Sequence, residues 1–489
     1  MQRITKLLLA AGVAFSTAPL LATDPVREQI RFRQSDEPVN AKAQDPAGLW
    51  LGVLKVGPIH LRIAYQVNRD EKDATKLTAK LISVDQGMVE VPMKTTSFVD
   101  GKLTTELPAG QIKYTGTFDN AGALVGEYKQ GTQTFPLKLE RIEKLPTLNR
   151  PQTPKKPYPY PSEEITFDNE SAKIKLAGTL TLPTGDGPFP AVVLVSGSGP
   201  QDRDETLFGH KPFLVLADHL ARNGIACLRY DDRGFGKSKG KFADATSADF
   251  ATDAHAALKY LLADKRIDPK RVGICGHSEG GIIAPLVATE HPTDVAFIVL
   301  LAGPGISGER VMYEQAYDFS KLADDKVTEK EIQEFVDAVM PIMRSSKPTA
   351  AAKKDLTEVM KKLIAAEKDE KKRKQAEEAL PTAMDRLADP WFRWFVCHDP
   401  APTLAKVKCP VLALNGEKDV QVKATQNLEV IESTLKKAGN KTFQAVELKG
   451  LNHLFQTCKT GQLMEYGEIE ETFAPNALKR ISDWIAERK

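Results

Sequence analysis

The sequence predicts an α/β protein in which a doubly wound, mostly parallel sheet with a helical cap insertion follows a small all-β domain. Three observations predict this. The chain has 489 residues, which is more than one ordinary domain holds. Residues 46–143 alternate apolar and polar side chains with a period of two, whereas residues 163–489 alternate strand-like and helix-like segments. Residues 144–162, between these parts, are rich in proline.

The first 22 residues have the pattern of a secretory signal peptide. Arg3 and Lys6 precede an apolar run that is too short to span a bilayer, and small residues follow near Ala22. We therefore expect export to the periplasm or the extracellular space, without a membrane anchor. Removal of this segment would leave Lys and Arg equal in number to Asp and Glu, which argues against a nucleic-acid or anionic-membrane partner.

Residues 46–143 are predicted to form an antiparallel β-domain, either a barrel or a sandwich. The segment "HLRIAYQV" alternates apolar and polar side chains, and turn signals such as Asp100-Gly101 separate runs of this kind. Six prolines fall within residues 144–162 and stiffen the chain there. We interpret this stretch as an extended linker at a domain boundary.

Residues 163–489 carry continuous apolar strands separated by amphipathic helices, the pattern of a parallel sheet covered on both faces. The predicted strands include "AVVLVSGSGP", "IACLRYDDRG", "RVGICGHS", "VAFIVLLAG" and "CPVLALNGEKD". Between about residues 305 and 400 the alternation stops, and a charge-rich helical stretch replaces it. We expect this insertion to form a cap over the edge of the sheet where ligands bind.

The motif "GHSEGG" places Ser278 between a strand and a helix. Ligands of such sheets collect beyond the carboxyl ends of the strands, which is where this serine falls. A sharp turn with small neighbours exposes the hydroxyl, and the start of the helix favours developing negative charge. The pattern favours a catalytic nucleophile over the alternative, a tight turn that leaves a buried strand.

A serine nucleophile needs a base, and the base needs an acid that orients it. When the serine lies on a sharp strand-to-helix turn (an elbow) of this kind, the acid comes next along the chain and the histidine last. His453 is the one histidine after the last candidate acid strand and is the predicted base. Asp419 and Glu417 both qualify as the acid by position, and Asp419 is preferred because it lies further past the strand end. The other histidines of this part are assigned structural, core or solvated roles, with His398 a weak competitor: His210, His219, His255, His277, His291 and His398.

Two backbone N–H groups are expected to bind the oxyanion that forms when Ser278 attacks a carbonyl group. We assign them to Glu279, which follows the nucleophile, and to Ser198 in the loop "SGSGP". The side chain of Glu279 has no assigned role. Four aromatic residues near the end of the cap are assigned either to an acyl-binding pocket or to packing of the cap on the sheet: Trp391, Phe392, Trp394 and Phe395.

No metal and no organic cofactor are expected. The five cysteines are widely spaced without a C-x-x-C pair, which disfavours metal ligation, and their odd number leaves their redox state open. Two partial matches to nucleotide-binding motifs fail. "DDRGFGKS" has Asp231 where a phosphate loop needs its first glycine, and "SGSGPQD" has Asp202 where a dinucleotide fingerprint needs its third.

The stretches "SGSGPQDRDE", "LRYDDRGFGKS", "GHSEGG", "NGEKD" and "NHLF" together resemble the α/β-hydrolase superfamily. More narrowly, the chain is similar to exported bacterial carboxylesterases that carry a β-rich N-terminal domain and are often labelled serine aminopeptidases or prolyl-oligopeptidase-like peptidases. The resemblance covers residues 163–489 well and the N-terminal domain more loosely. It implies ester hydrolysis through an acyl-enzyme, with Ser278, Asp419 and His453 at the motif positions. The oxyanion loop departs from the family, because it begins with "SGSG" rather than the more usual His-Gly.

We therefore expect a secreted serine carboxylesterase that acts on a small-molecule ester. The first alternative is a serine peptidase of the aminopeptidase type, or an acyl-thioester hydrolase, that uses the same three residues. The second is a surface-binding protein whose β-domain captures a partner while hydrolysis is secondary. The acyl-chain length, the alcohol and the oligomeric state are left open by the sequence.

Overall fold

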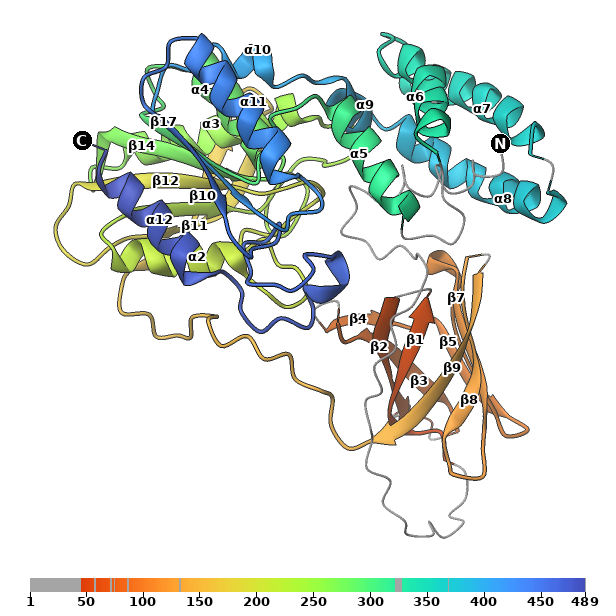
Figure 1. The fold of residues 1–489 in the computed structure, drawn as a ribbon. Coiled ribbons are helices and arrows are strands. Elements are labelled where there is room, and N and C mark those ends of the chain that lie inside the picture. Colours follow the sequence, from red (N-terminus) through yellow and green to blue (C-terminus); the bar gives the residue numbers. More distant parts are fainter. Residues whose placement is uncertain are drawn as a thin grey trace.

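The computed structural model describes residues 45–56, 59–70, 73, 75–85, 88–131, 133–321, 328–367 and 369–488. The segment interpreted as a signal peptide lies outside these residues. The described chain forms two sheets, one after the other, with a group of helices inserted into the second (Figure 1). No helix among the described residues is both long enough and apolar enough to cross a bilayer.

The N-terminal part is one antiparallel sheet with the spatial order β4-β3-β2-β1-β9-β8-β7-β6-β5. The sheet curls into a half-barrel, so that β3 and β5, near its two edges, touch. Alternate side chains point inward, and Trp50, Tyr65, Tyr114 and Leu139 belong to the core that they form. The strands are β1 (Gly48–Val56), β2 (Ile59–Arg69), β3 (Leu77–Ser83), β4 (Val89–Pro92), β5 (Thr95–Val99), β6 (Lys102–Leu107), β7 (Ile112–Phe118), β8 (Leu124–Gln130) and β9 (Gln133–Ile142), with η1 (Pro108–Gly110) between β6 and β7.

The segment between the two sheets is anchored to the C-terminal part by two side chains. The guanidinium of Arg150 donates hydrogen bonds to three backbone carbonyls there, which its five N–H donors allow. The side-chain amide of Gln152 bonds backbone groups of two further residues. The five partner residues are Phe208, Gly467, Ile469, Thr472 and Phe473.

The second sheet has the order β10-β11-β13-β12-β14-β15-β16-β17, antiparallel at β10 and β11 and parallel from β13 to β17. The chain winds from β12 to β13 on one side and then returns to β14 on the other. The loops after β12 and β14 therefore diverge, which opens a crevice at the carboxyl edge of the sheet. The strands are β10 (Ser162–Asn169), β11 (Ile174–Thr181), β12 (Phe189–Val195), β13 (Ala226–Tyr230), β14 (Ile267–His277), β15 (Phe297–Leu301), β16 (Val411–Gly416) and β17 (Phe443–Leu448).

Helices cover both faces of this sheet, because alternate side chains of a buried strand point to opposite faces. Val193 and Val195 of β12 share a core with α3 (Ser247–Ala263), α4 (Gly280–Glu290) and α11 (Ala424–Lys437). Val192 and Leu194 share the opposite core with α2 (Pro212–Arg222) and α12 (Pro475–Ala486). Figure 1 shows α2 and α12 on the face of the sheet opposite α4 and α11. The predicted doubly wound sheet behind an all-β domain is confirmed.

The inserted helices form a cap with a core of its own. Their apolar side chains make one cluster, which also contains Ile282 of α4, so the cap is joined to the helix that follows Ser278. The helices are α5 (Gly308–Lys321), α6 (Glu329–Met343), α7 (Thr349–Ala365), α8 (Glu370–Leu387) and α9 (Pro390–Cys397), after which α10 (Ala401–Leu404) returns to the sheet. The short η2 (Leu463–Glu465) lies in the long loop after β17.

Candidate active site

Ser278 occupies a tight turn between β14 and α4. Its φ is +52°, a left-handed value that non-glycine residues adopt at a cost of about 1–3 kcal/mol, and its backbone N–H donates to the Leu301 carbonyl over 2.8 Å. The flanking glycines make the turn sterically feasible. A Cβ on Gly276 would lie 1.9 Å from the Gly280 carbonyl oxygen, and a Cβ on Gly280 would lie 2.2 Å from the Val195 carbonyl oxygen. The motif therefore encodes the strained elbow through its glycines.

His453 and Asp419 lie together beyond the carboxyl ends of β17 and β16. Nδ1 of His453 is 2.7 Å from Oδ2 of Asp419, and both side chains are buried. The other carboxylate oxygen of Asp419 accepts the backbone N–H groups of Gln421 and Val422, each over 2.8 Å. Because these bonds fix the carboxylate, its free oxygen is held toward the imidazole.

Glu417, the alternative acid, faces away from His453. Its carboxylate accepts from the Lys449 ammonium over 3.2 Å and from the Gly450 N–H over 2.8 Å at the surface. The geometry therefore separates two acids that lie two residues apart on the same loop.

His277 links Ser278 to the His453 loop. Its Nε2 lies 3.0 Å from the backbone oxygen of His453, and the two imidazole rings are 4.8 Å apart. Its Nδ1 lies 2.8 Å from Oε1 of Glu205, and the same oxygen accepts the Gly197 N–H over 2.7 Å. One buried carboxylate thus joins the loop after β12 to the elbow.

Both ring nitrogens of His277 face hydrogen-bond acceptors. Burial by itself would lower the pKa of this imidazole, but the Glu205 carboxylate and the His453 carbonyl outweigh it, so the pKa is raised. The imidazolium form satisfies both contacts at once. The sequence indicates only a structural role for His277, and no signal in it points to Glu205 as the partner.

The carboxylate of Glu279 connects three separate parts of the site. It accepts hydrogen bonds from Ser247 Oγ of α3 over 2.5 Å, from Trp391 Nε1 of α9 over 2.6 Å, and from the side chain of Ser198. Burial raises the pKa of this carboxyl group, against the effect of the three donors. The side chain left without a role by the sequence therefore joins the elbow to α3, to the cap and to the loop that contains Ser198. The sequence contains one signal for this role, since Glu279 is an acid inside a run of small and apolar residues.

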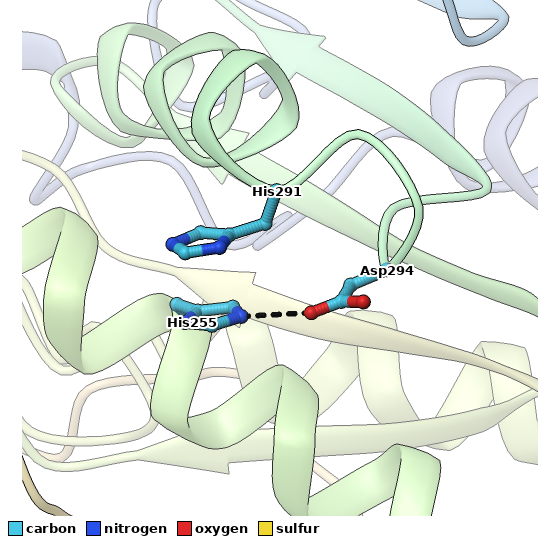
Figure 2. Close-up of side chains that lie close together, drawn as sticks. All are labelled: His255, His291 and Asp294. Carbon is cyan, nitrogen blue, oxygen red and sulfur yellow. Dashed lines mark hydrogen bonds and ion pairs between the residues drawn. The ribbon is translucent and has the colours of Figure 1, made fainter.

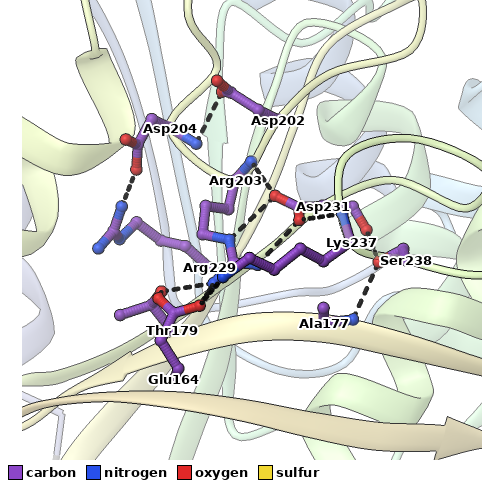
Figure 3. A network of polar contacts seen from close by, with 10 residues as sticks. All are labelled: Glu164, Ala177, Thr179, Asp202, Arg203, Asp204, Arg229, Asp231, Lys237 and Ser238. Atoms are coloured by element: carbon purple, nitrogen blue, oxygen red, sulfur yellow. Dashed lines mark hydrogen bonds and ion pairs between the residues drawn. The ribbon is translucent and has the colours of Figure 1, made fainter.

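The loop that contains Ser198 is fixed by acids at the end of β13. Arg203 forms a bidentate ion pair with Asp231 (Figure 3). The two N–O distances are 2.9 and 2.8 Å. Asp232 accepts from Ser196 Oγ over 2.9 Å. Rigid anchoring of this kind is what an oxyanion-binding loop needs, because donors that are already oriented pay no reorganisation during the reaction.

The four aromatic residues of α9 divide between the cap and the site. Phe392 and Phe395 are buried in the core of the cap. Trp394 stacks on His398, with 4.5 Å between ring centroids. Trp391 is the member of this group whose side chain reaches Glu279.

Comparisons with known proteins bear on the same region. A model of the family described as serine aminopeptidase, S33, matches residues 211–457, just over half of the chain. Esterase EstD of Thermotoga maritima is 34% identical over 213 residues, which are 43% of this chain and 46% of that protein. The quorum-quenching protein AidA of Acinetobacter baumannii is 31% identical over 121 residues, 24% of this chain and 36% of that protein. The chain thus spans less than half the length of these relatives.

Solved structures are more distant in sequence. Est1E from Butyrivibrio proteoclasticus with ferulic acid bound is 17% identical, with a TM-score of 0.38 over 66% of this chain and 98% of that chain. The esterase Pf2001 from Pyrococcus furiosus is 15% identical, with a TM-score of 0.41 over 71% of this chain and 99% of that chain.

Proposed function

The chain belongs to the serine aminopeptidase S33 family of α/β-hydrolases, and from this premise we propose that it cleaves carboxylic esters through a covalent acyl-enzyme. One observation carries the proposal. The His453–Asp419 pair, at 2.7 Å, lies on the loops next to the strained elbow that presents Ser278. A serine, a histidine and an oriented acid at one edge of a sheet are the parts that acyl transfer by a serine requires.

In the proposed reaction, Ser278 Oγ attacks the ester carbonyl carbon while Nε2 of His453 accepts the hydroxyl proton. Asp419 keeps the proton of His453 on Nδ1 and stabilises the imidazolium that forms. The oxyanion accepts hydrogen bonds from the backbone N–H groups of Glu279 and Ser198. The C–O bond to the alcohol then breaks, and the alcohol leaves with the proton from His453. Water then attacks the acyl carbonyl carbon while Nε2 of His453 accepts a proton from it. The bond to Ser278 Oγ breaks, Oγ takes the proton from His453, and the acid is released.

An ester substrate is favoured over an amide by one comparison. The relative that is 34% identical is named an esterase, and its matched segment is 43% of this chain. The family description favours the second candidate, an aminopeptidase that uses the same three residues. We further propose that the enzyme is exported, because of the signal-peptide pattern of residues 1–22, and that it acts on small-molecule esters.

Fluorophosphonate labelling and p-nitrophenyl ester turnover test the proposal together. The full chain is expected to become labelled and to hydrolyse the ester, whereas Ser278→Ala loses both. Ser433→Ala, which removes a hydroxyl from α11, serves as the matched control and retains both. Labelling that persists in Ser278→Ala would refute the nucleophile. Turnover of the matching anilide at the rate of the ester would favour the aminopeptidase.

A further inference from the structure

Three chemically reactive side chains meet at the end of α4 remote from Ser278. His255 lies on α3, His291 directly follows the last residue of α4, and Asp294 lies in the turn before β15 (Figure 2). The 11 residues of α4 make a helix about 16 Å long, so the cluster at its end lies about that far from the elbow at its start. The cluster is therefore distinct from the proposed active site.

The ligand atoms of the three residues already lie within 4.8 Å of one another. Nε2 of His255 is 3.0 Å from Oδ2 of Asp294, and the His291 ring stacks on the His255 ring with 3.4 Å between centroids. This is the one His, Cys, Asp and Glu group of this kind among the residues that the structure describes. All three side chains are half-buried, so an ion reaches them from solvent without unfolding.

The local backbone fixes two of the three ligands in a tight turn. The Asp294 N–H donates to the His291 carbonyl over 3.0 Å, and the His291 N–H donates to Val287 in the last turn of α4 over 2.8 Å. Oδ1 of Asp294 accepts from the Thr293 hydroxyl, which leaves Oδ2 facing His255. The spacing His-x-x-Asp thus presents an imidazole and a carboxylate on one short turn, and α3 supplies the second imidazole.

The contact between Nε2 of His255 and Oδ2 of Asp294 marks the position that a cation would occupy. The ligand atom of His291 lies within 4.8 Å of the ligand atoms of these two residues, so one ion can be shared by the three.

A groove of about 620 Å³ runs along the cluster, with His255 and His291 in its wall. The charged residues of its lining are the three acids Asp168, Glu170 and Glu290 and one base, Lys259. The negative balance favours cations, and the open space leaves room for a water molecule as a further ligand.

We propose that His255, His291 and Asp294 form a zinc-binding site that ties α3 to the turn between α4 and β15. Two imidazoles and one carboxylate are a ligand set that zinc prefers over calcium or magnesium, which take oxygen ligands. Three protein ligands leave the fourth tetrahedral position to water in the groove. The ion would link α3 to the end of α4, two of the helices that cover one face of the sheet, so zinc stabilises this helical layer.

The test uses the full chain, stripped with a chelator and titrated with zinc chloride alone by calorimetry. One zinc ion per chain is expected to bind, and the melting temperature is expected to rise. His291→Ala and Asp294→Asn each weaken binding by more than the about 10- to 100-fold that loss of an outer-shell partner costs, because each changes a direct ligand. Circular dichroism of the zinc-free variants shows that they are folded, and His291→Asn replaces His291→Ala if the latter is not.

Two further variants locate the ion. Among the described residues, His453→Ala removes the other close His–Asp pair, and His219→Ala removes a half-buried histidine on the opposite face of the sheet. Both variants are expected to bind zinc as the parent does. The proposal is overturned if the parent binds no zinc, if binding persists unchanged in His291→Ala and Asp294→Asn, or if it disappears in His453→Ala.

Discussion

The imidazole of His277, the residue before Ser278, forms a buried ion pair with the carboxylate of Glu205. The distance between Nδ1 and Oε1 is 2.8 Å. The pair holds the loop after β12 through the Gly197 N–H and the His453 loop through its backbone carbonyl. Three segments that converge on the proposed nucleophile are therefore positioned by one charged contact.

The pair predicts a pH-dependent stability. Because its folded pKa is raised, His277 keeps its proton in the native state where the unfolded chain, with a pKa of about 6.5, has lost it. The contribution of the pair is complete below about pH 6.5 and is lost as the pH rises through the folded pKa. Glu205→Gln is expected to lower the free energy of unfolding at pH 6 by about 3–5 kcal/mol, since one buried charge loses its partner, and to flatten its decline at higher pH. Urea unfolding between pH 6 and 9 measures both, and parallel curves for the two proteins would contradict the prediction.

Asp419→Asn is expected to lower kcat for ester hydrolysis by about 10⁴-fold without unfolding the protein. The amide oxygen can still accept the two backbone N–H groups, but the amide nitrogen cannot accept the Nδ1 proton of His453, so the imidazole is held in the wrong tautomer. Glu417→Gln, on the same loop and exposed, is the matched control and leaves kcat unchanged. A larger loss in Glu417→Gln than in Asp419→Asn would reverse the assignment of the acid.

Trp391→Phe is expected to cost about 1–3 kcal/mol of unfolding free energy and to lower kcat/KM. Phenylalanine keeps an aromatic ring, although a smaller one, and removes the N–H that donates to Glu279, so the buried carboxylate loses one of its donors next to Ser198. Trp394→Phe makes the same change one helical turn away, where the indole stacks on His398, and is expected to have the smaller effect on both quantities. Chemical denaturation and ester kinetics measure the two; equal effects would show that Glu279 does not depend on the indole N–H.

The parts of this protein that are encoded locally could be predicted from the sequence. Period-two alternation gives the strands of the N-terminal sheet, and continuous apolar runs give those of the second. The elbow is local too, because the Cβ atoms that Gly276 and Gly280 lack would overlap nearby backbone. The chain order of Ser278, Asp419 and His453 needs only the strand pattern, and the prediction of these three as catalytic awaits the variants described above.

Tertiary structure alone decided how distant segments meet. Glu279 accepts from Ser247 and Trp391, which lie on different helices far along the chain, and His255 meets His291 only because α3 packs on α4. The physical reason is that hydrophobic pattern and glycine sterics act within a few residues, whereas the partner of a buried carboxylate or imidazole depends on strand order and helix packing. The sequence by itself therefore determined the elements and the elbow, and the packed fold decided which polar groups share a hydrogen bond.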